Sequence, residues 1–155
     1  MDATCSTRCG DATVRNLDER TGALVARLDR LEGATAVVCA AGEVDYHTAA
    51  LLRDVVDGAL RAGAQALVID LSEVTFLDAA GLGVAVATAR TVGAERTAIV
   101  CHDALARLFR ITALDRALTI RATQTQALQA LGAATAGAGR WRTYSSGVPI
   151  ASSLR

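Results

Sequence analysis

The chain has 155 residues, and its 16 basic and 16 acidic side chains give a formal net charge of zero. This length suits one ordinary domain with tails, and the neutral balance argues against a nucleic-acid-binding face, which needs clustered positive charge. No apolar run approaches the roughly 18 residues that span a bilayer, and the first ten residues lack the apolar region of a signal peptide. We therefore expect a cytoplasmic protein.

The first third of the chain predicts an arm followed by a hairpin. Residues 1–21 are polar and aperiodic, which predicts a flexible N-terminal arm. Partial alternation over residues 24–31 predicts an exposed or edge strand, and the apolar run at 36–41 predicts a more buried strand. Because an unprotected edge strand can pair with another copy, the first strand offers a route to a homodimer.

The middle of the chain alternates between helical and strand patterns. Over residues 47–61 the apolar side chains recur on one stripe, which predicts an amphipathic helix. Residues 66–71 form an apolar run interrupted only by Asp70, which predicts a strand buried on both faces. A loop then leads to a second predicted helix at residues 79–91.

The last third repeats the alternation and ends in a tail. Residues 97–101 and 118–121 are predicted strands, and residues 103–110 and 123–131 are predicted helices. Residues 133–155 are rich in Ala, Gly, Ser and Thr and predict a flexible C-terminal tail.

Taken in order, these elements read β-β-α-β-α-β-α-β-α. Strands that alternate with helices imply crossover units and a mainly parallel sheet, and the N-terminal hairpin makes that sheet mixed. The sequence therefore predicts a single α/β domain over residues 22–132, with four to five strands and about four helices.

Enzyme chemistry finds little support in these residues. Cys101 and His102 are adjacent on a predicted strand, where neighbouring side chains point to opposite faces, so they are not expected to form a dyad. The Gly81-Leu82-Gly83 segment lacks the spacing of a phosphate-binding loop. Cys5 and Cys9 lack a second pair of ligands, so they are a weak signal for a metal or redox site. We expect no catalytic residue and no cofactor.

Acidic residues at predicted strand ends raise the question of a metal site. They are Glu43, Asp45, Asp70 and Asp78. Gathered on one edge they could bind Mg²⁺, but Asp78 lies where a helix N-cap belongs and the others suit solvated positions, so we expect no metal.

The helix start after Asp78 favours an anion, and a hydroxyl there would be a good phosphate acceptor. Ala79 carries none.

Three segments, in order and at compatible spacing, carry a family signature. Residues 68–84 read VIDLSEVTFLDAAGLGV. This segment has a predicted strand that leads into Asp-Leu-Ser, then an apolar residue directly before an Asp, and finally Gly-Leu beginning three residues after that Asp. Residues 42–45 read GEVD, and residues 108–115 read LFRITALD, with Ala113 where glycine is common. Together they resemble the STAS domains of the anti-sigma factor antagonist type, over about residues 24–131.

The resemblance implies a regulatory binding protein and not an enzyme. Members of this family bind an anti-sigma factor, usually a serine kinase of the ATP-binding GHKL type, and so release a sigma factor. The kinase phosphorylates a serine at the start of the second helix, which breaks the complex, and a phosphatase reverses the step. The added charge of about −1.5 to −2 in a contact surface accounts for the dissociation.

The phosphoacceptor position of the family falls on Ala79 in this chain. Three explanations stay open: a natural antagonist that its kinase cannot switch off, a diverged STAS protein whose partner is not a kinase, and an engineered Ser→Ala change. Ser72 and Thr75, in the predicted loop before the helix, are alternative phosphosites, and Thr112 is a further hydroxyl expected near that loop.

The expected partner is an anti-sigma factor, and the expected contact surface surrounds the second helix start. We assign to it Asp45, Tyr46, His47, Thr75, Phe76, Asp78, Ala79, Ala80, Gly81 and Leu82. Gly81 and the alanines are expected to keep the helix start flat for an approaching partner. The alternative is a STAS module that senses a small anionic ligand or nucleotide, or a soluble subunit of a membrane transporter. Only the transporter alternative would bring membrane contact.

Overall fold

The computed structural model describes residues 13–15 and 24–137. The predicted N-terminal arm and C-terminal tail, with Cys5 and Cys9, lie largely outside these residues. The strands are β1 (Thr13–Arg15), β2 (Val25–Glu32), β3 (Thr35–Val44), β4 (Ala66–Leu77), β5 (Thr97–Val100) and β6 (Thr119–Arg121). The helices are α1 (Ala49–Arg61), α2 (Ala79–Val92), α3 (Asp103–Ile111) and α4 (Gln124–Gly137), and two short 3₁₀ turns are η1 (Ala94–Arg96) and η2 (Leu114–Arg116).

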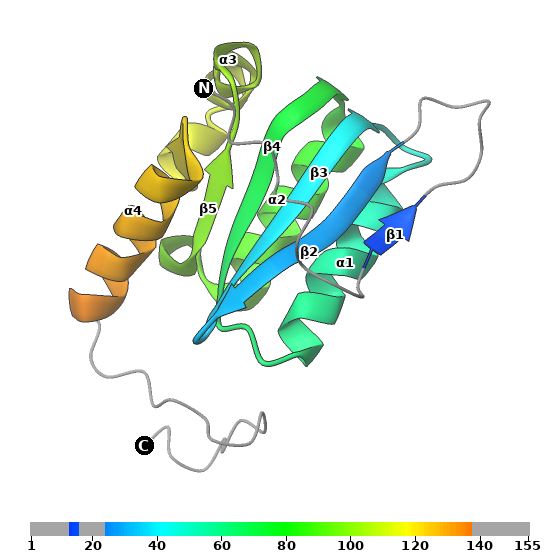
Figure 1. Ribbon diagram of the computed structural model, residues 1–155. Helices are drawn as coiled ribbons and strands as arrows, with labels where there is room; N and C mark the ends of the chain where they lie inside the picture. The colour runs from blue at the N-terminus through cyan, green and yellow to red at the C-terminus, as the bar shows by residue number, and fades with distance from the viewer. Residues whose placement is uncertain (1–12, 16–23, 138–155) are drawn as a thin grey trace.

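The strands form one sheet in sequence order, β1-β2-β3-β4-β5-β6 (Figure 1). The pairs β1–β2 and β2–β3 are antiparallel, and the three following pairs are parallel. This is the predicted mixed α/β sheet with helical crossovers, and from β2 onward the order of strands and α-helices is the predicted one.

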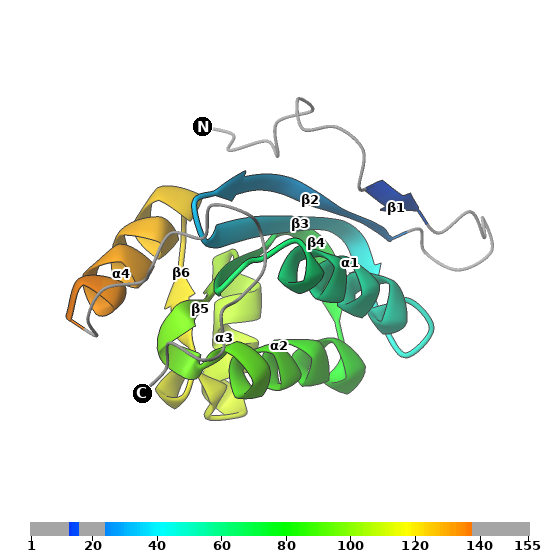
Figure 2. The same ribbon diagram turned by 90° about the horizontal axis from the view of Figure 1, so that it is seen from below.

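Helices lie on both faces of the sheet, three on one face and α4 on part of the other (Figure 2). The first layer contains α1, α2 and α3, whose inward side chains join the large apolar core around Leu52, Ile69, Val84 and Phe109. The second contains α4, which covers a smaller apolar cluster on the opposite face of the sheet. Leu131 of α4 belongs to that cluster. The amphipathic stripe of α1 is confirmed, because its inner residues Leu52, Val55, Val56 and Ala59 are all buried.

One strand was not predicted. β1 lies inside the segment predicted as an arm, and it pairs with Val25, Ala26 and Arg27 of β2. The prediction of an open edge on the first hairpin strand is therefore wrong at these three residues, because β1 covers them. A three-residue strand is too short to show a hydrophobic period, so pairing with β2 defines it.

The segment predicted as a loop before α2 is strand. β4 continues to Leu77, and the placement of Ser72 and Thr75 in a loop is corrected. Its second half pairs with the end of β3, but the register shifts between Cys39 and Ala41 and again between Gly42 and Glu43. Such irregularities break the alternation of buried and exposed side chains, so this part of β4 shows no clear strand period.

Candidate partner-binding site

Asp78 begins α2 and closes its N-terminus. Its backbone is extended, with φ −104° and ψ −172°, and its Oδ1 accepts hydrogen bonds from the N–H groups of Ala80 at 2.8 Å and Gly81 at 3.1 Å. These bonds satisfy two of the backbone donors that a helix start leaves open. The predicted N-cap is confirmed.

The other oxygen of Asp78 joins α2 to the loop after β3. Asp78 Oδ2 accepts a hydrogen bond from the backbone N–H of Tyr46 at 3.0 Å, and the N–H of Asp78 donates to the Val44 carbonyl at 3.1 Å. Val44 and Leu77 are register partners at the ends of the parallel strands β3 and β4. The two predicted groups of contact residues, 45–47 and 75–82, therefore lie together at the carboxyl ends of the central strands β3 and β4 (Figure 1).

A compact turn around Asp45 fixes the loop that carries Tyr46. Asp45 Oδ1 accepts from the N–H of His47 at 2.8 Å and of Thr48 at 2.9 Å, while the N–H of Asp45 donates to Thr48 Oγ1 at 2.9 Å. The Thr48 hydroxyl donates to the Glu43 carbonyl at 2.8 Å, and Thr48 is fully buried. The hydrogen bond from the Thr48 N–H is the main cause that lowers the pKa of Asp45, and it outweighs the opposing effect of desolvation.

Thr48 was missed by sequence reasoning. The signal that could have found it is the spacing Asp45-x-x-Thr48 directly before the apolar stripe of α1, which resembles a reciprocal capping pair. The turn also explains why α1 begins at Ala49 and not at His47.

Large hydrophobic side chains are exposed at the carboxyl ends of β3 and β4. Tyr46 is 80% exposed and Phe76 is 50% exposed, and they are two of the three large exposed hydrophobic side chains in the described residues. The ring of His47 meets the ring of Tyr46 edge-on at 5.5 Å. Thr75 and Ala79 are exposed, and Ala80 and Leu82 are half-buried. Exposed aromatic side chains next to a rigid helix start are typical of a protein-binding surface.

The role predicted for Gly81 is wrong. Gly81 is buried, and a Cβ atom built there would lie 2.9 Å from Val44 Cγ1 and still closer to Leu77 Cδ1. The missing side chain thus lets the first turn of α2 approach the ends of β3 and β4. The absence of a side chain at Gly81 serves packing inside the domain, and this buried residue does not form part of the exposed surface.

A shallow groove extends from the helix start along the outer side of α2. Its volume is about 440 Å³. The wall on α2 consists of Ala79, Leu82, Gly83, Val86, Ala87 and Arg90, and the opposite wall consists of Thr112 and Leu114. The groove joins the third sequence motif, residues 108–115, to the position of Ala79. Thr112, which was expected near the segment that carries Ser72 and Thr75, shares this groove with Ala79.

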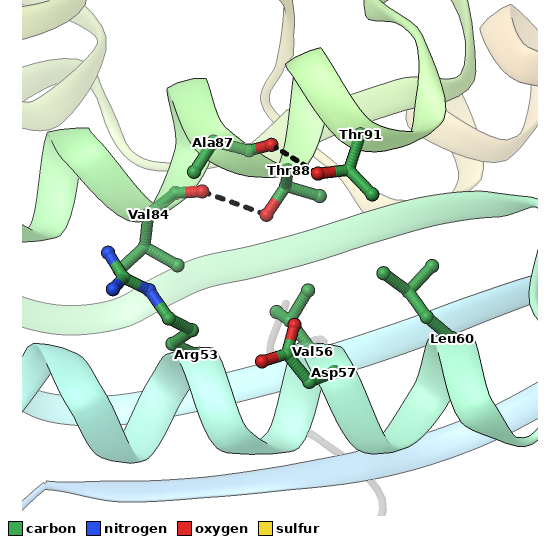
Figure 3. Close-up of a pocket in the computed structure, with 8 residues that line it drawn as sticks. All are labelled: Arg53, Val56, Asp57, Leu60, Val84, Ala87, Thr88 and Thr91. Atoms are coloured by element: carbon green, nitrogen blue, oxygen red, sulfur yellow. Dashed lines mark hydrogen bonds between the residues drawn. The ribbon is translucent and has the colours of Figure 1, made fainter.

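A second hollow, of about 320 Å³, lies between α1 and α2 (Figure 3). Arg53, Asp57 and apolar side chains line it. The two threonines in it bond within their own helix, because the Thr88 hydroxyl donates to Val84 O at 2.8 Å and the Thr91 hydroxyl to Ala87 O at 3.0 Å. Both hydroxyls are already satisfied, so neither needs a ligand.

The alternative phosphosites differ in their surroundings. Ser72 is half-buried, and its N–H donates to Asp70 Oδ1 at 2.9 Å. Thr75 is exposed, and its hydroxyl donates to the Gly42 carbonyl of the neighbouring strand at 3.3 Å. Neither residue lines the groove beside Ala79.

Three of the four acidic residues considered for a metal site accept hydrogen bonds within the domain. Asp70 is buried, and its Oδ2 accepts a hydrogen bond from Gln124 Nε2 of α4 at 2.5 Å, whereas Asp45 and Asp78 hold the loop and the helix start described above. Across the part of the chain that the structure describes, no group of three or more His, Cys, Asp or Glu side chains could hold a metal ion.

The adjacent Cys101 and His102 have separate environments. Cys101 is buried, and burial together with the nearby Asp70 charge raises the pKa of its thiol to about 11, so the nucleophilic thiolate is disfavoured. His102 is exposed, and its Nε2 lies 2.9 Å from the carbonyl oxygen of Val74.

None of the helices in the described ranges has both the length and the hydropathy of a membrane span.

Comparison with known proteins identifies the family. Residues 28–122 match the family model described as "Mlab, STAS domain". The chain is 33% identical over 95 residues to the anti-sigma-F factor antagonist RsfB of Mycobacterium tuberculosis, covering 60% of this chain and 78% of that protein. It is 33% identical over 84 residues to the anti-sigma-B factor antagonist of Listeria monocytogenes, covering 52% of this chain and 74% of that protein.

Solved structures agree with this match. A crystal structure of an anti-sigma factor antagonist from Mycobacterium paratuberculosis has a TM-score of 0.64 and 31% identity, over 70% of this chain and 94% of that chain. The phosphorylated form of SpoIIAA from Bacillus, at 18% identity and a TM-score of 0.51 over 67% of this chain and 96% of that chain, supports the fold alone. The chain therefore belongs to the STAS domain family of anti-sigma factor antagonists.

Proposed function

We propose that this chain binds an anti-sigma factor and thereby releases a sigma factor, without catalysis of its own. The names of its relatives support the class of partner, since they are antagonists of anti-sigma factors. The observation that carries the proposal is the exposed pair Tyr46 and Phe76 beside the start of α2, where Asp78 binds both the Tyr46 N–H and the first turn of the helix.

Binding would use a surface that is already ordered. The turn at Asp45 and the cap at Asp78 are formed within the chain, so the contact residues need little rearrangement when a partner arrives. Burying an aromatic side chain in a contact contributes roughly 1.5–3 kcal/mol, so Tyr46 and Phe76 together would supply a large share of the binding free energy.

Ala79 determines how such a complex could be regulated. Ala79 is the exposed first residue of α2, and its methyl side chain has no oxygen that could accept a phosphoryl group. We propose that Ala79 occupies the position of the family's phosphoacceptor serine, so that a kinase partner could not dissociate the complex by modifying this residue. A partner that is not a kinase would fit the same geometry, and so would an engineered Ser→Ala change.

Binding of purified anti-sigma factors from the same genome tests the proposal. Isothermal titration calorimetry should give a complex with one of them, and Tyr46→Ala and Phe76→Ala should each raise Kd about 10- to 30-fold. Gln129→Ala is the control, because Gln129 is exposed on α4 on the other face of the sheet. Failure of all these anti-sigma factors to bind, or equal binding by the aromatic variants, would contradict the proposal.

Restoring the hydroxyl tests the assignment of position 79. Ala79→Ser should become a phosphate acceptor for an anti-sigma factor that is a kinase, and the phosphorylated form should bind that partner more weakly. If a kinase binds this variant but leaves Ser at 79 unmodified, the assignment of the position is wrong.

A further inference from the structure

We propose that Thr112 is the phosphoacceptor of this chain and replaces the absent hydroxyl at position 79. The inference rests on the proposed function, because the switch would act on the same partner-binding surface. The observation behind it is that Ala79 and Thr112 line one groove, from α2 and from the end of α3 respectively. Among the residues that line this groove, Thr112 alone carries a hydroxyl.

Thr112 is accessible to an enzyme. It caps the C-terminal end of α3, and the turn of Ile111, Thr112 and Ala113 is exposed throughout, with Ile111 at 73%. Ala113 has a left-handed backbone with φ 58°, so the chain turns sharply away after the threonine. The hydroxyl therefore lies at the surface, next to the contact residues.

The hydroxyl of Thr112 bonds only within its own helix. Thr112 Oγ1 lies within donating distance of two carbonyls there, Leu108 at 3.0 Å and Phe109 at 3.1 Å. These are bonds between neutral groups at an exposed helix end, where water can replace them when the oxygen reacts. Thr75, the other exposed candidate, donates instead to a neighbouring strand and lies outside the groove.

The reaction is phosphoryl transfer from a nucleoside triphosphate bound by a partner kinase. A bond forms between Thr112 Oγ1 and the γ-phosphorus, and the bond from that phosphorus to the oxygen bridging it to the β-phosphate breaks. The nucleoside diphosphate leaves, and the hydroxyl proton passes to a base of the kinase.

The product would change the groove from apolar to anionic. Phosphorylation removes the hydroxyl donor to Leu108 O and Phe109 O, of which Leu108 O keeps the backbone N–H of Thr112, and it adds a charge of about −1.5 to −2 at the negative end of the α3 dipole. Both effects disfavour a phosphate packed against α3, and Arg90 lines the same groove. Arg90 makes no ion pair within the described residues, and its guanidinium is a suitable partner for a phosphate. An apolar contact of a partner in this groove would then be lost.

Thr91→Val is the matched control for Thr112→Val. Thr91 is also an exposed threonine whose hydroxyl donates to the carbonyl four residues earlier at 3.0 Å, but it lines the hollow on the other side of α2. Thr75, the alternative phosphosite near the start of α2, belongs to the proposed contact surface, so it is examined in the parent chain without substitution.

The first test is phosphopeptide mapping of the full-length chain recovered from its native cells with phosphatase inhibitors. A phosphoryl group on Thr112 is expected, together with its absence from Thr112→Val and its retention in Thr91→Val. An unmodified chain, or a phosphate on Ser72 or Thr75 alone, would overturn the proposal.

The second test separates this inference from the proposed function. With a purified anti-sigma factor, Thr112→Glu should raise Kd on the order of tenfold or more because it places a charge in an apolar contact, and Thr112→Gln, which has a similar size and no charge, should raise Kd much less. Equal binding by Thr112→Glu would overturn the switch while the proposed function stands. If the parent chain binds no anti-sigma factor, the proposed function fails, and the phosphopeptide map alone decides whether Thr112 is modified.

Discussion

The carboxylate of Asp78 joins the start of α2 to the backbone N–H of Tyr46, 32 residues earlier in the chain, at 3.0 Å. One side chain thus caps a helix with one oxygen and positions an exposed aromatic residue with the other. The stability of the helix start and the geometry of the proposed contact surface therefore depend on the same residue.

Asp78→Ala should lower both stability and partner binding. Loss of an N-cap costs about 1–2 kcal/mol in the free energy of unfolding, and the Tyr46 N–H loses its acceptor as well. Urea unfolding followed by circular dichroism measures the change. Asp103→Ala is the control, since Asp103 is the first residue of α3 and makes no side-chain cap bond there. Similar losses in the two variants would contradict a special role for Asp78.

Asp45 should make folding stability depend on pH. The pKa of Asp45 is lowered in the folded chain, so its charged form is favoured there; the resulting stabilisation is present above the ordinary value near 3.8 and is lost as pH falls through the folded value. The difference in free energy of unfolding between the parent chain and Asp45→Asn should therefore be steady near pH 7 and shrink below about pH 4. Denaturant unfolding over this pH range measures it, and a difference that grows on acidification would contradict the stated hydrogen bonding.

Two glycines of α2 should respond to alanine in opposite directions. Gly81→Ala should destabilise the fold by about 1–3 kcal/mol, because the new methyl group meets Val44 and Leu77. A Cβ at Gly83 meets no atom within 4 Å, so Gly83→Ala should stabilise by about 0.5–1 kcal/mol through helix propensity. Thermal unfolding of both variants checks the signs, and equal shifts would show that the close approach at Gly81 is unimportant.

Ala113→Gly should stabilise the turn after α3. An alanine at φ 58° carries a steric cost of about 1–2 kcal/mol that glycine avoids, and the greater freedom of unfolded glycine offsets part of it. The expected net gain is about 0.5–1 kcal/mol in the free energy of unfolding. Ala117→Gly is the matched control, because Ala117 has φ −103° and should lose stability on the same change. A loss in both variants would argue against strain at Ala113.

The fold class, the α1 stripe, the cap at Asp78 and the family could all be predicted from the amino-acid sequence. These features depend on patterns within a few residues: helical spacing, an apolar run, or a polar residue before a helix, together with short motifs that survive in this chain. The hydrophobic pattern of α1 could be read directly because one face of that helix is buried in a single core.

Features that depend on neighbours distant in the chain could not be predicted before the fold was known. β1 exists as a strand through pairing with β2, and the end of β4 hides its period because its register with β3 shifts twice. Gly81 proved to be an internal packing position because β3 and β4 end beneath it. That Thr112 and Ala79 line the same groove follows from the packing of η2 and the end of α3 beside α2. Residues 33 positions apart share a surface only after the crossovers have formed, so local sequence patterns do not encode that contact.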